Sequence, residues 1–136
     1  MAAALAMMAT IQGCAVEWTR EHRLYCSMDE QLLVRDTLYF GLSIPDGGEV
    51  AEADWKRFEN DTISHLFPQG FTVLDAHGAR RGTSGDAIHE PSRVVIVIHD
   101  DDAKSRSAVE EIVRDYRAAF RQEAVLRERA AVCVSR

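Results

Sequence analysis

The sequence predicts a single α+β domain whose elements follow one another in the order β-α-β-β-α-β. Three observations lead to this prediction. The chain has 136 residues, close to the roughly 150 of one ordinary domain. Hydrophobic residues make up 46% of the chain and charged residues 28%, which is typical of a soluble protein with a packed core. Four segments have the pattern of strands and two have the pattern of helices.

The first strand and the first helix are separated by a turn of Pro, Asp and Gly. Over residues 37–44 apolar and polar side chains alternate, which is the two-residue period of a half-buried strand, and residues 45–48 end it. Over residues 51–67 large apolar side chains recur at helical spacing, and Pro68 prevents the helix from continuing. We therefore expect a strand over 37–44 and a helix over 51–67.

The second half of the chain predicts two strands, a helix and a last strand. Residues 71–76 form a β-rich run, and residues 93–99 have a Val-Val-Ile-Val-Ile core that is apolar on both faces. One apolar face over residues 104–121 predicts the second helix, with Asp102 or Ser105 as its N-cap. Residues after that helix, 125–134, predict the final strand.

This order is the split βαβ, or ferredoxin-like, arrangement, a four-stranded antiparallel sheet with two helices on one face. Right-handed crossovers place the first and third strands in the middle of the sheet. A central strand that is apolar on both faces needs a cover on each side, and the two helices cover only one. We expect Tyr39, Val95 and Val97 on the open side, where a homodimer partner or another envelope protein would cover them.

Charge and motifs exclude several classes of function. Sixteen basic residues against 22 acidic ones give a net charge of −6, which argues against nucleic acid as a partner. No apolar run reaches the roughly 18 to 20 residues of a membrane-spanning helix. The sequence has no phosphate-binding glycine loop, no zinc spacing and no nucleophile-elbow motif. We therefore predict no cofactor, no metal and no catalytic residue, and an enzyme is the less favoured class.

The N-terminus has features of an export leader. Residues 1–13 are apolar and uncharged and run directly into Cys14, like the end of a signal peptide, although the basic first part is missing. Ile11 and Gly13 fit a lipoprotein cleavage box, from which Gln12 departs. We predict a leader and linker over 1–25, a folded domain over 26–136, and a periplasmic protein or a lipoprotein anchored only through Cys14. The alternative is an ordinary apolar helix or tail with a buried cysteine.

Cys26 and Cys133 bracket almost the whole predicted domain. Exported compartments oxidise such a pair, whereas a cytosolic chain would keep two thiols. The predicted topology places the end of the last strand beside the start of the first, which brings the two cysteines together. A bridge across 107 residues would remove close to 4.7 kcal/mol of unfolded-chain entropy in the loop-closure model. We therefore predict a disulfide rather than a metal site.

Six short motifs occur in unbroken order. They are Leu38-Tyr39-Phe40-Gly41, Glu52-Ala53-Asp54-Trp55, Phe67-Pro68-Gln69-Gly70-Phe71-Thr72-Val73-Leu74-Asp75, Glu90-Pro91-Ser92-Arg93-Val94, Gln122-Glu123-Ala124-Val125-Leu126 and Cys133-Val134-Ser135. Over residues 34–135 the chain resembles the bacterial family called domain of unknown function 3574. The resemblance implies a small exported protein or lipoprotein, with cysteines placed like Cys26 and Cys133, and implies no activity.

The chain departs from that family pattern at a few positions. Thr37 stands where an acidic residue is usual, and Ala51 stands where a helix-capping Ser or Thr is usual. The loss of that cap should weaken the start of the first helix by about 1 kcal/mol. Ala79 and Arg80 stand where Gln and Trp are usual, and the chain ends in Arg136 rather than an aromatic residue. A family site built on the Trp and the acidic residue would be altered here.

Several polar side chains are candidates for ligand binding: Tyr39, Asp75, His77, Arg81, Glu90, Arg93 and Arg127. Asp75 and His77 lie two apart on a strand, where the carboxylate could orient the imidazole for proton transfer; the alternative is a polar strand end. Clustered arginines can bind a carboxylate or phosphate, or they can form surface ion pairs with nearby glutamates.

Other polar residues have simpler interpretations. The acidic run 100–102 could bind a divalent ion, but an acidic run before a helix is also stabilised by the helix N-terminus. His22, His65, His89 and His99 are scattered along the sequence, and we expect each at the surface.

Two hypotheses about function follow. The favoured one is a non-enzymatic exported module that self-associates through its open sheet face. The alternative is a small enzyme or ligand-binding protein with a pocket on that face, lined by Tyr39, Asp75, His77 and Arg127.

Overall fold

The structure is a computed structural model that describes residues 25–45, 47–81 and 83–135. The predicted leader and Cys14 lie outside the described residues. The elements are β1 (Gln31–Gly41), α1 (Glu52–Phe58), η1 (Glu59–Ile63), α2 (Ser64–Leu66), β2 (Thr72–Arg81), β3 (Ala87–His99), α3 (Ala103–Phe120) and β4 (Leu126–Val134).

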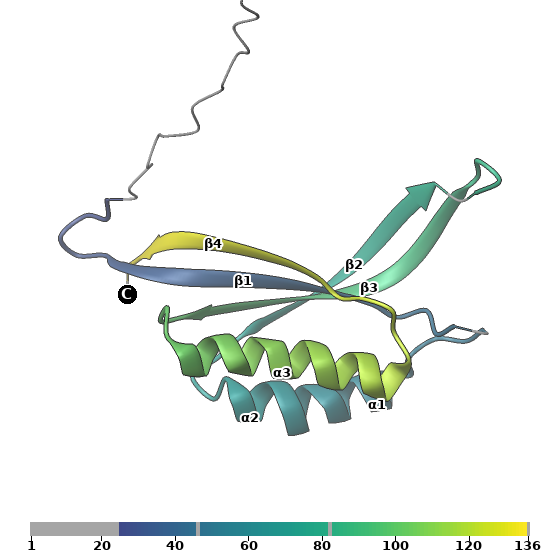
Figure 1. Ribbon diagram of the computed structural model, residues 1–136, viewed down its shortest axis with the longest axis horizontal. Coiled ribbons are helices and arrows are strands. Elements are labelled where there is room, and N and C mark those ends of the chain that lie inside the picture. Colours follow the sequence, from purple (N-terminus) through teal and green to yellow (C-terminus); the bar gives the residue numbers. More distant parts are fainter. Residues whose placement is uncertain (1–24, 46, 82, 136) are drawn as a thin grey trace, which may run out of the picture.

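The four strands form one antiparallel sheet in the order β2-β3-β1-β4. The first and third strands lie in the middle, as right-handed crossovers require. Figure 1 shows α1 and α2 in line along one helical segment, which lies beside α3 on one face of this sheet. The predicted ferredoxin-like α+β fold is confirmed.

The strands are longer than the sequence pattern predicted. β1 begins at Gln31 rather than residue 37, because residues 31–36 pair with β4. β3 begins at Ala87 rather than residue 93, and its first residues pair with the end of β2. These two strand ends form a hairpin that extends beyond the helices (Figure 1). Backbone pairing sets these strand ends, and side-chain alternation does not reveal them.

The helix ends agree with the caps that the sequence offers. Asp102 is the N-cap of α3, and its Oδ1 accepts a hydrogen bond of 2.7 Å from the backbone N–H of Ser105. Ala51 occupies the extended N-cap position of α1 without any side-chain hydrogen bond. No helix in the described part of the chain is both long and apolar enough to cross a membrane.

The core lies between the sheet and the helices. The sheet contributes Leu38, Phe40, Val95 and Val97, and the helices contribute Trp55, Phe58, Ile63, Val109, Ile112 and Tyr116. The aromatic rings pack edge to face; the centroids of Phe40 and Tyr116, for example, are 4.6 Å apart. This layer is where most of the apolar surface is buried.

The prediction that Val95 and Val97 lie on the open face is wrong. Both are fully buried beneath the helices, because they pair with Leu38 and Asp36 on the inward side of β1. Their neighbours Val94, Ile96 and Ile98 therefore lie on the open side. A strand that is apolar on both faces carries no polar side to reveal its orientation, so the pairing with β1 decides it.

Candidate functional site

The predicted pocket residues lie on opposite faces of the sheet. Tyr39 pairs with Leu126 and Val94 on the open side. Arg127 pairs with Leu38, and Asp75 pairs with Arg93, so both lie on the helix side, and so does His77 two residues further along β2. The prediction of one pocket lined by Tyr39, Asp75, His77 and Arg127 is therefore wrong. Sequence spacing places residues on alternate faces within one strand, but the register between strands decides which faces coincide.

A buried charge cluster, formed by Asp36, His99 and Arg127, lies on the helix side. The Asp36 carboxylate is fully buried. Its Oδ1 accepts a hydrogen bond from Arg127 Nε at 2.7 Å, and its Oδ2 accepts one from Nη2 at 3.1 Å. His99 Nε2 lies 2.8 Å from the same Oδ2. Burial raises the pKa of Asp36, but the hydrogen bonds and positive charges of Arg127 and His99 lower it by more than burial raises it. The net shift of the pKa is therefore downward.

His99 has no ring nitrogen left for a substrate. Its Nε2 faces Asp36, and its Nδ1 lies 2.7 Å from the carbonyl oxygen of Asp100. The expectation that His99 lies at the surface is wrong, because the residue is only 8% exposed. Asp36 was not among the predicted candidates. Its signal was an aspartate at an inward position of an otherwise apolar strand face, between Val34 and Leu38.

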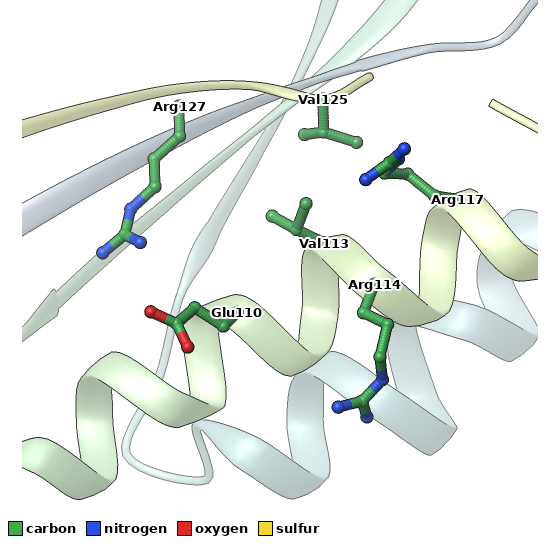
Figure 2. Close-up of a pocket in the computed structure, with 6 residues that line it drawn as sticks. All are labelled: Glu110, Val113, Arg114, Arg117, Val125 and Arg127. Carbon is green, nitrogen blue, oxygen red and sulfur yellow. The ribbon is translucent and has the colours of Figure 1, made fainter. Parts of the chain in front are cut away.

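Arg127 also lines a groove between α3 and β4. The groove has a volume of about 210 Å³ and is lined by Glu110, Val113, Arg114, Arg117, Val125 and Arg127. Figure 2 shows Val113 and Val125 pointing toward one another across it. Because Arg127 uses two of its guanidinium nitrogens on Asp36, it fixes β4 against the core beside this groove.

A larger cleft, of about 900 Å³, lies at the end of the sheet. Its walls come from the turn after α2, the end of β3, the start of β1 and the first turns of α3, including His65, Phe67, His99 and Lys104. None of the seven candidate ligand-binding residues lines this cleft, although His99 of the buried charge cluster and Asp100 and Asp102 of the acidic run lie in its wall.

Asp75 and Arg93 meet as an ion pair rather than as a ligand site. Arg93 Nη1 contacts the Asp75 carboxylate, and its Nη2 lies 2.5 Å from Glu52 Oε2. The guanidinium carbon of Arg93 lies 5.8 Å from the ring centroid of Trp55, a cation–π contact. These contacts favour the simpler interpretation that the sequence allowed, in which the arginines form surface ion pairs.

Glu90 and Arg81 belong to the hairpin of β2 and β3. The Glu90 carboxylate lies over Gly41, where a Cβ atom would come within 2.5 Å of Glu90 Oε1, so a side chain at position 41 would displace the end of the Glu90 side chain. Arg81 Nη1 donates a hydrogen bond to the carbonyl of Gly85 at 3.2 Å. His77 and His89 are exposed on the same hairpin.

The open face is the side of the sheet that no helix covers in the described structure. Its apolar residues come from all four strands: Leu33, Leu74, Val94, Ile96, Ile98, Leu126 and Val132. Three large ones are strongly exposed, Leu126 at 64%, Leu74 at 49% and Ile98 at 46%. The Tyr39 hydroxyl donates a hydrogen bond of 2.7 Å to Glu128 Oε2 on this face. That hydrogen bond raises the pKa of Tyr39.

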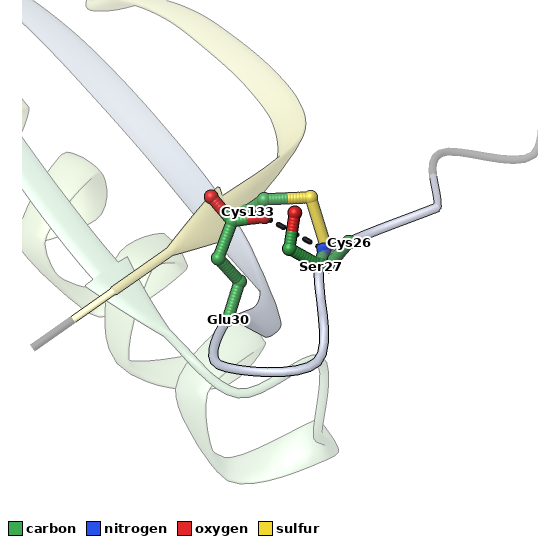
Figure 3. Close-up of a disulfide and its surroundings, with 4 residues drawn as sticks. All are labelled: Cys26, Ser27, Glu30 and Cys133. Carbon is green, nitrogen blue, oxygen red and sulfur yellow. Dashed lines mark hydrogen bonds between the residues drawn. A yellow bond between two sulfur atoms is a disulfide. The ribbon is translucent and has the colours of Figure 1, made fainter.

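Cys26 and Cys133 form a disulfide, as predicted, with their Cα atoms 5.3 Å apart. A turn presents Cys26 to the end of β4: Ser27 N–H donates to Glu30 Oε2 at 2.8 Å, and Glu30 N–H donates to the Ser27 carbonyl. Figure 3 shows the bridge beside this turn. Cys26, Glu30 and Cys133 are also the one group of three possible metal ligands in the described ranges, but the disulfide uses both sulfur atoms.

Solved structures share this fold at low sequence identity. A phage SAM lyase in complex with S-methyl-5'-thioadenosine superimposes with a TM-score of 0.54 at 16% identity, over 84% of this chain and 95% of that one. The phage SAM lyase in its apo state gives a TM-score of 0.55 at 18% identity, over 77% of this chain and 90% of that one. These likenesses establish the fold alone. No curated protein matches the chain.

The family comparison covers nearly all of the folded region. The model of the family described as "Protein of unknown function (DUF3574)" matches residues 35–135, from the middle of β1 to the end of β4. This is the family that the six sequence motifs indicated. The chain belongs to this family.

Proposed function

We propose that this protein is a non-enzymatic, exported interaction module of the cell envelope that self-associates through its open face. The observation that carries the proposal is the apolar character of that face. Leu74, Ile98 and Leu126 expose between 46% and 64% of their surface there. Several large apolar side chains exposed on one face of a sheet are typical of a surface that associates with another protein.

The size of the open face suits a second copy of the chain. Four strands about 4.8 Å apart and about nine residues long, at about 3.3 Å per residue, make a face of roughly 19 by 30 Å. Side chains make its accessible area larger than this outline of roughly 600 Å², so it approaches the roughly 800 Å² per partner of a standard interface. A sheet face of this size can pack against its own copy at about 10 Å.

The contacts of the candidate polar residues favour binding over catalysis. Arg127 is bound to Asp36, Arg93 is bound to Asp75 and Glu52, and Tyr39 donates to Glu128. Each of these side chains is already held by a partner within the chain, which is typical of a role in packing and orientation. The open face, in contrast, has apolar surface that a partner would bury.

The disulfide supports the proposed compartment. Bridges such as Cys26–Cys133 persist in oxidising compartments and are rare in the cytosol. We therefore propose that the protein lies in the periplasm, or on a membrane through a lipid on Cys14. Cell fractionation with fatty-acid labelling tests this placement: label that is lost in Cys14→Ala supports the anchor. Recovery of the protein in the cytosol with Cys26 and Cys133 as free thiols would overturn the proposed export.

Sedimentation analysis at micromolar concentration tests self-association. We expect a dimer for the natural chain and a monomer for Ile98→Asp and Leu126→Asp. Leu32→Asp is the matched control, because Leu32 is 57% exposed but pairs with Cys133 on the opposite side of the sheet. A natural chain that sediments as a monomer would refute the proposal. Equal loss of the dimer in Leu32→Asp would also refute it, because the open face would then have no special role.

A further inference from the structure

Two opposite charges lie diagonally on the open face. Glu128 of β4 is paired with Thr37, and Arg35 of β1 is paired with Ala130, so the two charged residues are diagonal neighbours on adjacent strands. Diagonal neighbours on a sheet are separated by roughly 7 to 8 Å. Both side chains are exposed, while Thr37 between them is buried.

Each of these charges has capacity for another partner. Glu128 Oε2 accepts the Tyr39 hydroxyl at 2.7 Å, and in the described residues Oε1 has no hydrogen-bond partner. Arg35 makes no hydrogen bond or ion pair with any residue that the structure describes. This differs from the helix side of the same strand, where Asp36 is held by both Arg127 and His99.

We infer that Arg35 of one copy binds Glu128 of the partner subunit, so that two reciprocal ion pairs fix the arrangement of the dimer. This inference rests on the self-association proposed above and specifies its geometry. A two-fold axis in the plane of the interface can pass midway between Arg35 and Glu128, at right angles to the line that joins them. Rotation about that axis places each Arg35 over Glu128 of the partner subunit, the reciprocal contact of an isologous interface.

The cost of enclosing a charge in the interface favours the pairing of Arg35 with Glu128. When two open faces meet, water leaves the space between them, and a charge enclosed without a partner is costly. Opposite charges across an interface remove that cost, fix the register of the two surfaces and exclude partners with the wrong charge pattern. Burial of the apolar residues of the open face favours association, and the ion pairs of Arg35 with Glu128 fix how the two copies align.

Charge reversal tests the inference. In Arg35→Glu and in Glu128→Arg, both ion pairs of the dimer become repulsive, so we expect each variant to associate about tenfold more weakly or worse. The double variant Arg35→Glu/Glu128→Arg should recover association. A mixture of the two single variants should form mixed dimers, because both pairs are then attractive. Sedimentation equilibrium measures all four, and far-UV circular dichroism checks that each variant is folded.

Two matched variants separate the ion pair from other effects. Tyr39→Phe removes the hydrogen bond to Glu128 but keeps its charge, and Arg129→Glu reverses a neighbouring charge on the helix side of β4. Both should dimerise like the natural chain. If Ile98→Asp gives a monomer while neither charge reversal weakens the dimer, the ion pair is refuted and the open-face dimer stands. If the single variants fail to form mixed dimers, the reciprocal arrangement is refuted; a monomeric natural chain refutes both proposals.

Discussion

Replacing Arg127 with methionine should remove much of the stability of the fold. Arg127 makes two hydrogen bonds to Asp36, at 2.7 and 3.1 Å, and the aspartate is fully buried. Methionine keeps the aliphatic part of the side chain and removes the charge, which leaves a buried carboxylate with His99 alone. Breaking a buried pair in this way costs about 3–5 kcal/mol. Urea denaturation followed by far-UV circular dichroism measures the change in the free energy of unfolding.

Arg129→Met is the matched control. Arg129 lies two residues further along β4 on the same side of the sheet, and it pairs with Asp101, whose side chain is 62% exposed. An exposed pair is worth about 1 kcal/mol or less, so this variant should differ little from the natural chain. Equal losses in the two variants would refute the reasoning, because burial of Asp36 would then make no difference. Adding Asp36→Asn to Arg127→Met should restore part of the loss by removing the uncompensated charge.

Other predictions concern the disulfide, the buried aspartate and the helix caps. Reduction of the disulfide should lower the free energy of unfolding by up to about 4.7 kcal/mol, and Cys26→Ser should abolish the effect of reductant. A loss below about 1 kcal/mol would contradict the view that the bridge stabilises the fold by restricting the unfolded chain. Because folding lowers the pKa of Asp36, this residue contributes to stability above about pH 4. The contribution is lost as the pH falls through the lower pKa of the folded state. Measuring the free energy of unfolding against pH should show this loss, and the loss should be smaller in Arg127→Met. Ala51→Ser should raise the melting temperature, because a hydroxyl at this extended N-cap adds about 0.5–1 kcal/mol of stability. Asp102→Ala should lower stability by about 0.5–2 kcal/mol, because the hydrogen bond to Ser105 is lost. Unchanged melting temperatures in both variants would mean that neither cap limits stability.

The sequence by itself determined the order of the elements, the fold and the disulfide. Apolar side chains repeat every two residues in a half-buried strand and about every 3.6 residues in an amphipathic helix, because of the local backbone geometry. These repeats therefore identify strands and helices without any tertiary information. The order of those elements admits few topologies, and the right-handed crossovers leave one that brings Cys26 to Cys133. Asp102 could be predicted as a helix N-cap for the same reason, because its hydrogen bond to Ser105 is a local contact.

Only the tertiary structure decided which side of the sheet each residue faces and which charges meet. Val94 and Val95 are equivalent in the sequence pattern, and the register with β1 places Val95 beneath the helices and Val94 on the opposite side of the sheet. Asp36 and Arg127 lie 91 residues apart, so nothing local signals their contact. Strand pairing sums many long-range contacts, and a shift of one residue would move every side chain to the other face, which is why the open face and the buried charge cluster emerge only from the folded chain.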